Sequence, residues 1–376
     1  MRIAVVHNLP PGGARRRLEQ QLLHVDGDVV EICLGDASAV TDDPIRIPHD
    51  QLAPRAPRPV RPPLRYLDLA ATLVAWTRAA AALRRVKPDV VYANPCRFLQ
   101  APPALIGAPA PSLYFCDEPH LPASDPEVRR SRNETTRFVY AGLYELQRRA
   151  DRVATRRATR IATNSRHTAH RILAIYGRTA EVLPMGVPDG FSPSFEQRTH
   201  ILSVGTLLPE KGHELVLAAA ARAATRRPVV IVAPRPDPAA AAQLQQQAKA
   251  LAVELDIRTA ISDEELVQAY RQAHATLYLA REEPFGLASL EAQACGSPVI
   301  VSAGGGLPET LVEGVSGWAV ERNADAVAAR IDALDDASTR QRMAAAAAAH
   351  GATASWSRAG QALLDTLDEL YEGSAR

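Results

Sequence analysis

Lysine is almost missing from this 376-residue sequence: 40 of its 43 basic residues are arginine, and the lysines are Lys87, Lys211 and Lys249. A composition rich in arginine, alanine and proline is typical of a GC-rich genome, in which a lysine is rarely accidental. Lys211 stands beside a glycine in LLPEKGHE. It is therefore the first candidate for a functional cation.

Cysteine is scarce as well. The four cysteines are far apart and show neither C-x-x-C nor metal-finger spacing, which argues against a disulfide scaffold and a zinc finger. The N-terminus MRIAVVHNLPPGG lacks the apolar stretch of a secretory signal, and no apolar run is long enough to span a bilayer. We expect reduced thiols in a cytoplasmic protein. The cysteines are Cys33, Cys96, Cys116 and Cys295.

The net charge is only +1, but the two halves of the chain differ. Residues 1–185 carry 27 basic and 18 acidic side chains, whereas 186–376 carry 16 and 24. This split favours two domains with different partners, the basic one facing something anionic. The alternative explanation is that the solvent-exposed surfaces of the two halves differ in charge by chance. The length of the chain also favours two domains over one.

Short β-branched runs alternate with amphipathic segments rich in alanine and leucine, which is the pattern of βα units on parallel sheets. The series restarts after a turn-rich stretch near 186–198, where we place a linker. We predict an α/β fold with one domain over 1–188 and another over 199–355. The expected strands are 2–6, 28–34, 89–92, 111–115, 160–163 and 180–183 in the first half, and 199–205, 228–233, 257–261, 275–279 and 297–301 in the second.

The stretch PRAPRPVRPPLR, residues 54–65, holds five prolines and four arginines. Such a composition predicts a stiff, extended, basic loop. It is expected to act as a lid over an acceptor or as a contact with an anionic surface. An ordinary proline-rich connection is equally compatible with the composition.

The segment REEPFGLASLEAQACGSPV, residues 281–299, combines a loop and a helix after the expected strand 275–279. In parallel sheets, ligands bind beyond the carboxyl ends of strands, where helix N-termini present N–H groups. The backbone N–H groups around Gly286 and Leu287 are therefore expected to face a phosphate. Glu291, about one turn into the helix, suits a ribose diol, and Glu283 on the loop suits a group beyond the phosphate. Two surface glutamates around a turn are the alternative.

Two further stretches point to the same edge of the second domain. Gly205 ends the expected strand 199–205, and Lys211 opens the next helix, where a point charge can neutralise a diphosphate as it leaves. The three glycines 304–306 allow close approach of a ligand, although a turn also uses them. Gly12 and Gly13 follow the first strand without the G-x-G-x-x-G fingerprint, so an NAD site is not supported.

At this point the sequence resembles the retaining glycosyltransferases of family 4, over nearly its whole length. Glu283 to Val299 is similar to the family's E-P-F-G-L-x-x-L-E-A-x-A-C-G-x-P-V block. VGTLLPEKG, GGLPE and EGVSGW resemble further family elements, as do YFCDEPHLP and VLPMGVPDGF in the first half. The resemblance implies the GT-B architecture: two Rossmann-like domains with a cleft between them and a C-terminal helix, 356–376, that crosses back to the first domain.

The resemblance also implies roles for individual residues. Glu283 would contact the donor sugar, Glu291 the ribose and Lys211 the diphosphate, with the backbone of Gly13 and of 285–287 near the phosphates. Retaining members generally need no metal, and the only D-x-D here, at 26–28, lies at a turn. No cofactor is expected beyond the nucleotide sugar as co-substrate.

Two positions depart from the family pattern. Thr206 stands where the family has an arginine five residues before the lysine, and Arg235 and Arg281 are the candidates to replace that cation. Asp117 stands where the family has a histidine, and His120 is a candidate to take over its contact with the donor sugar. An ordinary loop histidine is the alternative for His120.

The favoured function is retaining transfer of a hexose from a nucleoside diphosphate sugar, UDP favoured over GDP, to an acceptor hydroxyl. The acceptor could be a glycan, a lipid-linked intermediate or a small natural product. The second domain would bind the nucleotide sugar. The basic first domain would bind the acceptor through Arg15, Arg16, Arg17 and the loop 54–65, with peripheral contact to an anionic inner membrane face and no role for nucleic acid. The alternatives are a nucleotide-sugar epimerase or sugar phosphorylase of the same fold, or a protein that binds nucleotide sugar without turnover.

Overall fold

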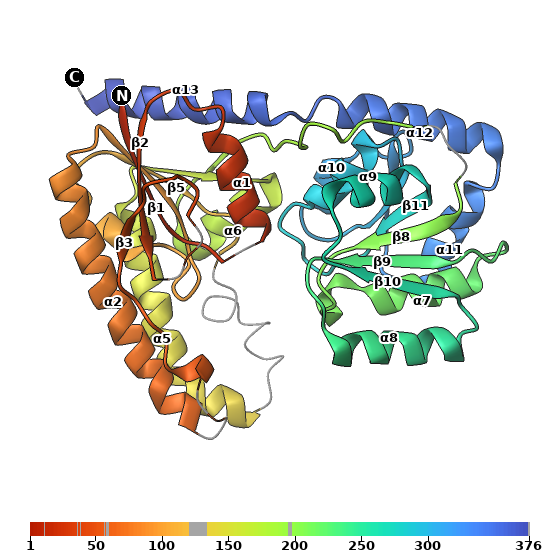
Figure 1. Cartoon of the computed structure of the whole chain (residues 1–376), viewed down its shortest axis with the longest axis horizontal. Helices are drawn as coiled ribbons and strands as arrows, with labels where there is room; N and C mark the ends of the chain where they lie inside the picture. The colour runs from red at the N-terminus through yellow and green to blue at the C-terminus, as the bar shows by residue number, and fades with distance from the viewer. Residues whose placement is uncertain are drawn as a thin grey trace. The chain divides into compact units, whose positions relative to one another are not determined.

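A computed structural model of the chain describes residues 1–10, 12–35, 37, 39–55, 57, 60–119, 134–194 and 198–374. The chain divides into two compact units (Figure 1). The first unit comprises Met1–Pro184 and Ala359–Arg376, and the second comprises Met185–Arg358. Each unit is built on its own parallel sheet.

The sheet of the first unit has seven parallel strands in the order β3-β2-β1-β4-β5-β6-β7. Its central strands are continuous runs of buried apolar residues, as expected for strands covered on both faces. The short strand Ile45–Ile47 was not predicted from the sequence. The strands are β1 (Arg2–Asn8), β2 (Asp28–Leu34), β3 (Ile45–Ile47), β4 (Val90–Cys96), β5 (Ser112–Phe115), β6 (Arg160–Thr163) and β7 (Glu181–Val182).

Helices cover this sheet, and two long ones, α2 and α5, pack side by side with the 3-10 segment η3. The prediction of an extended loop over 54–65 is wrong at both ends, and Pro54 and Arg55 lie in the 3-10 segment η1 (Ala53–Arg55). Residues 61–65 form the first turn of α2, because prolines there need no intrahelical N–H partner and have a helical φ already set. The helices of the first unit are α1 (Gly13–Leu22), η1 (Ala53–Arg55), α2 (Arg61–Val86), η3 (Pro103–Gly107), α5 (Glu134–Arg157) and α6 (Arg166–Tyr176).

The C-terminal helix α13 (Trp356–Ser374) joins the first unit from Ala359 onward. Gly360 lets it approach α1 closely, since a Cβ there would lie 2.4 Å from the Cβ of His24. Arg160 on β6 pairs with Glu369 at 2.6 Å, and Leu363 and Leu367 are fully buried. A C-terminal helix that returns to the first unit is thus a feature of the fold.

Asp151 on α5 is a buried carboxyl that links three elements of the first unit. Tyr176 of α6 donates to its Oδ2 at 2.6 Å, and the N–H of Ala101 donates to its Oδ1 at 3.0 Å. Burial raises the pKa of Asp151 to about 7, although both hydrogen bonds favour the carboxylate. The folded state therefore holds a proton that the unfolded chain releases near its ordinary pKa of about 4.

We predict that this proton makes folding stability fall as pH rises. The contribution of Asp151 is complete below about pH 4 and is lost as pH rises through its folded pKa of about 7. The free energy of unfolding should drop by about 2 kcal/mol between pH 5 and 6.5 because of this group. Urea titrations across that range check it. In Asp151→Asn, whose amide oxygen can accept from Ala101 and whose amide N–H can donate to the Tyr176 oxygen, the slope should flatten, and an unchanged slope would contradict the assignment.

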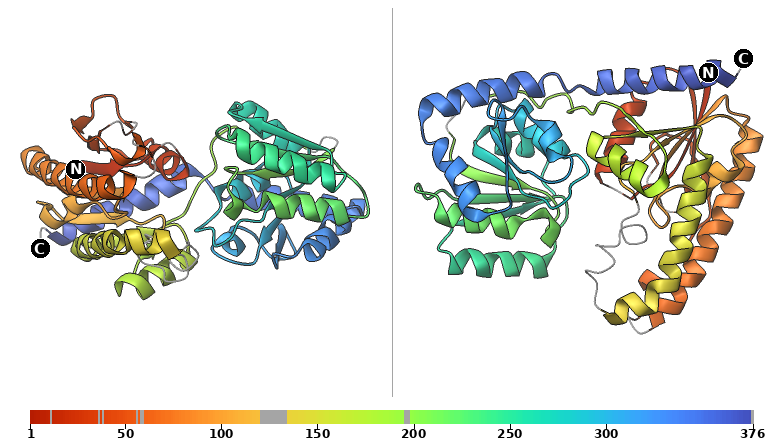
Figure 2. Two further views of the ribbon diagram at one scale, coloured as in Figure 1. Left: turned by 90° about the horizontal axis from the view of Figure 1, so that it is seen from below. Right: turned by 180° about the vertical axis from the view of Figure 1, so that it is seen from behind.

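The second unit has a six-stranded parallel sheet in the order β10-β9-β8-β11-β12-β13. Helices α7, α8 and α11 lie on one face, and α9, α10 and α12 lie on the other (Figures 1 and 2). The strands are β8 (His200–Val204), β9 (Val229–Ala233), β10 (Leu255–Thr259), β11 (Ala273–Tyr278), β12 (Val299–Ser302) and β13 (Gly317–Val320). The helices are η4 (Pro209–Lys211), α7 (His213–Arg222), α8 (Pro238–Ala250), α9 (Asp263–Arg271), α10 (Leu287–Ala294), η5 (Leu307–Thr310), α11 (Ala324–Ala333) and α12 (Ala337–Gly351).

The stretch expected to be a linker, 186–198, belongs to the second unit over its described residues. The N–H of Val187 donates to the carbonyl of Ala354 at 3.1 Å, and a Cβ on Gly186 would lie 2.3 Å from the backbone nitrogen of Trp356. Arg271 of α9 donates to both the carbonyl and the hydroxyl of Ser192. These contacts tie the stretch to α9 and to the segment before α13.

The two predicted Rossmann-like sheets are confirmed. In the described part of the chain, no helix is both long and apolar enough to cross a lipid bilayer.

Candidate functional site

The carboxyl ends of β8 and β11 form the candidate site in the second unit. The sheet order reverses between these two strands, because β9 follows β8 on one side and β12 follows β11 on the other. Ligands of open parallel sheets bind at such a reversal. The loops that follow are 205–212 after β8 and 279–286 after β11, and they carry the predicted donor-binding residues.

Glu283 lies on the loop after β11, and each of its carboxylate oxygens has a partner. Lys211 donates to Oε2 at 2.7 Å, and the Tyr278 hydroxyl donates to Oε1 at 3.0 Å. The side chains of Lys211 and Glu283 remain 21% and 17% exposed, so a ligand from solvent can reach the ion pair. The structure thus brings together two predicted residues that are 72 positions apart, and it adds a tyrosine that sequence reasoning missed.

The glycine run 304–306 holds the Glu283 loop in place. The N–H of Gly306 donates to the carbonyl of Glu283 at 2.7 Å. Gly305 has a φ of 72°, and a Cβ there would lie 2.4 Å from the Glu283 carbonyl oxygen. Any larger residue at 305 would collide with the loop, so these glycines serve close backbone packing behind Glu283.

Helix α10 begins directly after this loop. Gly286, its N-cap, has a φ of 112°, and no side chain caps the first turn. A Cβ on Gly286 would lie 2.4 Å from Leu307 Cδ2, so the position needs glycine. The N-terminus of a helix favours an anion through its N–H groups and its dipole. This geometry fits the phosphate expected near Phe285, Gly286 and Leu287.

Glu291 lies one turn further along α10 and is 6% exposed. Tyr270 of α9, fully buried, donates its hydroxyl to Glu291 Oε2 at 3.0 Å. Burial and the adjacent carboxylate raise the pKa of Tyr270 well above its ordinary value, so it remains a donor. Sequence reasoning missed Tyr270, which appears there only as one aromatic residue in a helix.

Lys211 ends the 3-10 turn after β8, and glycines shape its surroundings. Gly212 has a φ of 78°, and a Cβ there would lie 2.3 Å from the carbonyl of Leu279. The Lys211 stem passes over Gly205, whose Cβ position lies 3.6 Å from Lys211 Cγ and Cδ. The K-G pair therefore packs the β8 loop onto the end of β11 while leaving the ammonium group at Glu283.

The backbone carbonyl of Thr206 is held in place by a hydrogen bond from His213. Burial lowers the pKa of His213, so this imidazole is neutral, and its Nε2–H donates to the Thr206 carbonyl at 3.0 Å. Its Nδ1 then accepts from the Ser203 hydroxyl, also at 3.0 Å. The Thr206 hydroxyl is buried without a hydrogen-bond partner in the described structure. This hydroxyl supplies none of the positive charge that the family's arginine would bring.

Two arginines gather beside Lys211 instead. The N–H of Arg281 donates to the carbonyl of Glu210 at 2.7 Å. Arg322, after β13, places Nη1 3.0 Å from the Cβ position of Gly212, and burial together with Arg281 lowers the pKa of Arg322. Arg322 was missed from the sequence. Arg235 is exposed in the turn after β9, on the far side of β8 from β11.

In the first unit, Asp117 follows β5 and accepts two hydrogen bonds from Arg17 of α1, both at 2.8 Å. Arg17 is 1% exposed, so the expectation that it contacts an acceptor at the surface is wrong. Arg15 donates to the carbonyl of Ala39 and pairs with Glu19. His120 lies outside the described residues.

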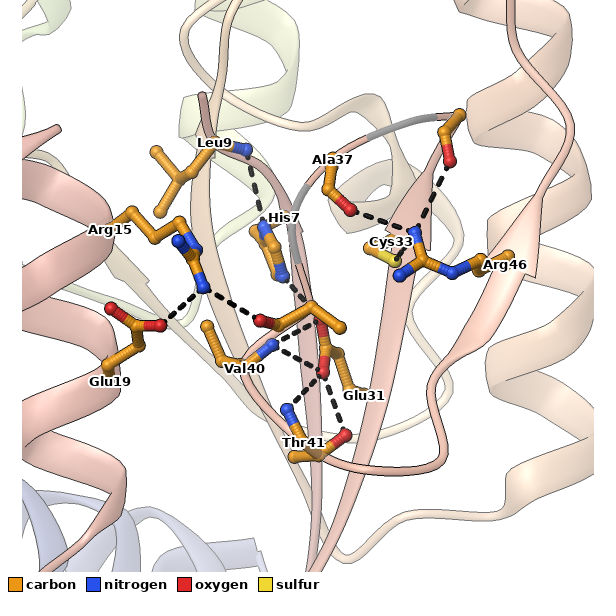
Figure 3. A network of polar contacts seen from close by, with 12 residues as sticks. His7, Leu9, Arg15, Glu19, Glu31, Cys33, Ala37, Val40, Thr41 and Arg46 are labelled. Carbon is orange, nitrogen blue, oxygen red and sulfur yellow. Dashed lines mark hydrogen bonds and ion pairs between the residues drawn. The ribbon is translucent and has the colours of Figure 1, made fainter. Parts of the chain in front are cut away.

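The loop that leads to Gly13 is anchored by a buried pair on β1 and β2 (Figure 3). His7 Nε2 lies 2.8 Å from Glu31, and the N–H of Leu9 donates to His7 Nδ1 at 3.2 Å. Because Nδ1 accepts, the proton of the neutral ring is on Nε2 and points at Glu31. Burial opposes the charge of Glu31, but hydrogen bonds from His7 and Thr41 outweigh it and lower the pKa of Glu31. Gly13 then begins α1.

No group of three or more His, Cys, Asp or Glu side chains could hold a metal ion within the described ranges. Asp28, part of the D-x-D sequence, pairs with Arg2 at 2.6 Å.

Sequence comparison finds a family match within the second unit. Residues 190–350 match the family described as Glycosyl transferases group 1. This part of the chain is similar to the group 1 glycosyl transferases. The family segment covers the whole candidate site, from Gly205 through Lys211 and Glu283 to Glu291.

Curated relatives of this family include D-inositol 3-phosphate glycosyltransferases. That of Paenarthrobacter aurescens is 29% identical over 239 residues, which cover 57% of this chain and 59% of the relative. That of Geodermatophilus obscurus is 33% identical over 245 residues, which cover 58% and 53%. The matched region thus spans somewhat more than half the length of these relatives.

Solved structures share the fold over the whole chain. Anabaena HepE, solved in complex with UDP, aligns with a TM-score of 0.75 at 18% identity, covering 98% of this chain and all of HepE. WaaG, a glycosyltransferase involved in lipopolysaccharide biosynthesis, aligns with a TM-score of 0.71 at 15% identity, covering 97% and 99%. The fold of the chain is therefore GT-B, as predicted.

Proposed function

We propose that the protein is a retaining glycosyltransferase that moves a hexose from a nucleoside diphosphate sugar, UDP favoured over GDP, to an acceptor hydroxyl. One observation carries the proposal: Lys211 and Glu283 form a solvent-accessible ion pair where the sheet order reverses, beside the uncapped N-terminus of α10. A cation, a helix N-terminus and a carboxylate within one site match a diphosphate and a sugar hydroxyl.

In the proposed reaction, the bond between the anomeric carbon and the β-phosphate oxygen breaks while the acceptor oxygen bonds to the same face of the sugar. The acceptor proton passes to the departing phosphate. Lys211 neutralises the charge that the diphosphate gains, and the N–H groups at Gly286 and Leu287 contribute in the same direction. Glu283 binds hydroxyls of the donor sugar and Glu291 binds the ribose diol. Arg281 and Arg322 supply positive charge near Lys211, in place of the arginine that Thr206 replaces.

The choice of UDP follows the structural relatives, since HepE has been solved with UDP and with UDP-glucose. The acceptor is proposed to bind in the basic first unit, and an acceptor in an anionic lipid surface would place the protein at the cytoplasmic face of a membrane. A nucleotide-sugar epimerase or a binding protein without turnover is the competing function, and release of UDP that depends on an added acceptor would exclude both.

Calorimetric titration with UDP, GDP and ADP, with and without Mg²⁺, tests the donor site. We expect binding to one nucleotide that is independent of Mg²⁺. In Glu291→Ala, its Kd should rise about 10- to 100-fold, because hydrogen bonds from two hydroxyls to a carboxylate are lost. The exposed Glu264→Ala, on α9, is the matched control and should bind as the wild type does. If none of the three nucleotides binds, the proposal fails.

A further inference from the structure

Each glutamate of the E-x7-E pair is held by one tyrosine hydroxyl. Tyr278, the last residue of β11, donates to Glu283, and Tyr270 on α9 donates to Glu291, both at 3.0 Å. The two phenols come from different elements and reach different ends of the site. Neither pairing follows from the spacing of the motif itself.

Tyr278 also contacts other parts of the donor site. Its ring centroid lies 5.9 Å from Lys211 Nζ, within the range of a cation–π interaction. Its ring edge lies 3.4 Å from the Cβ position of Gly286, the N-cap of α10. Tyr278 is 6% exposed, so its ring is fixed by packing and its hydroxyl has a defined direction. Burial, followed by the charge of Glu283, raises the pKa of Tyr278 well above its ordinary value.

Lys211 and Tyr278, the two described partners of the Glu283 carboxylate, would be attracted to an incoming diphosphate to different degrees. Lys211 is flexible and carries a charge that two phosphates would attract away from the single carboxylate. The Tyr278 hydroxyl is neutral and buried, so the diphosphate offers it no comparable attraction. If Lys211 turns toward the diphosphate, Glu283 loses that hydrogen bond. The hydrogen bond from the Tyr278 hydroxyl is then the described one that the carboxylate keeps.

We propose that Tyr278 and Tyr270 are positioning residues, which keep Glu283 and Glu291 in their binding orientations while Lys211 transfers its charge to the donor diphosphate. This inference rests on the proposed function and deepens it. It assigns the two hydroxyls separate effects. Tyr278 acts through the carboxylate at the sugar and affects turnover, whereas Tyr270 acts through the carboxylate at the ribose and affects nucleotide affinity.

The test removes one hydroxyl at a time, with Tyr278→Phe and Tyr270→Phe, in the full-length protein. For Tyr278→Phe we expect kcat with a UDP-hexose to fall about 10-fold, with the Kd for UDP nearly unchanged, since a hydrogen bond to a charged group is lost at the sugar only. For Tyr270→Phe we expect the Kd for UDP to rise about 10-fold, with kcat nearly unchanged. The exposed Tyr371→Phe, on α13, is the control for loss of a phenol hydroxyl.

Two further readouts separate positioning from mere support of the fold. In a Glu283→Gln background, Tyr278→Phe should cost much less than it does alone, as expected when two residues act through one contact. Thermal unfolding of each variant shows whether stability has changed as well.

The outcomes are distinct. The positioning roles would be overturned if Tyr278→Phe and Tyr270→Phe had equal effects on kcat and Kd. They would also be overturned if the losses were additive in the double variant Glu283→Gln with Tyr278→Phe. A wild type that turns over the sugar nucleotide together with an unaffected Tyr278→Phe would overturn this inference alone. A wild type that binds none of UDP, GDP and ADP would overturn the proposed function and this inference with it.

Discussion

Replacing Lys211 with alanine is expected to reduce turnover of a UDP-hexose by two to three orders of magnitude. The ammonium group lies 2.7 Å from Glu283 and is the nearest described cation to that carboxylate. Removing one preorganised group that stabilises developing charge typically costs about 10²- to 10³-fold in kcat. The loss should appear mainly in kcat, because the diphosphate gains its extra charge only as the glycosidic bond breaks. Steady-state kinetics with UDP-glucose measure it.

Lys249→Ala is the matched control, since Lys249 is exposed on α8 and the substitution removes the same charge. It should leave kcat and KM unchanged. Lys211→Arg should restore only part of the rate, because a planar guanidinium does not take the position of a compact ammonium group. A Lys211→Ala variant with wild-type kcat would remove Lys211 from the reaction and would leave Arg281 and Arg322 to act on the diphosphate.

The residues of the candidate site could be predicted to lie together because their signals are local. Glu283, Gly286 and Glu291 fall within nine residues, and the change from strand to loop to helix fixes which way they face. The glycine run 304–306 was a weak signal for a ligand contact, and the structure gives it another role. Its glycines pack behind the Glu283 loop, a use that depends on an approach between two loops that no local pattern encodes.

The supporting residues could not be predicted, because they are set by how distant segments pack. Tyr270 and Tyr278 read as ordinary buried aromatics in a helix and a strand, and only the folded sheet turns their hydroxyls toward the glutamates. Arg322 lies 111 positions after Lys211 and approaches it because β13 and β8 end at the same edge of the sheet. The strand β13 that positions Arg322 was not among the strands expected from the sequence, so no local signal pointed to this arginine.

Asp117, in the first unit, is a second case in which the partner of a residue could not be predicted from the sequence. Its departure from the family's histidine was visible, but its partner Arg17 lies 100 residues away. The segment ARRR suggested an exposed basic patch, whereas the helical period buries one of the three arginines. Tyr92 and Asn94, both within the central strand β4, complete this polar cluster, and neither was singled out from the sequence.

Arg17 is expected to be essential for the stability of the first unit. It donates to both Asp117 oxygens, to Asn94 at 2.8 Å and to Tyr92 at 2.9 Å, and its guanidinium lies 3.7 Å from the Phe115 ring centroid. Burial opposes its charge, but Asp117 and Tyr92 outweigh that cost and raise the pKa of Arg17. The cluster therefore depends on one side chain.

Arg17→Met should lower the free energy of unfolding by about 3–5 kcal/mol, the cost of leaving the partner of a buried ion pair without compensation. Urea titration followed by circular dichroism measures it, with the exposed Arg85→Met on α2 as the control. The double variant Arg17→Met with Asp117→Leu should be more stable than Arg17→Met alone, because no unpaired carboxylate remains. If Arg17→Met unfolds like the control, the cluster does not stabilise the unit, and the Arg17–Asp117 pair would instead have to be retained for the chemistry at Asp117.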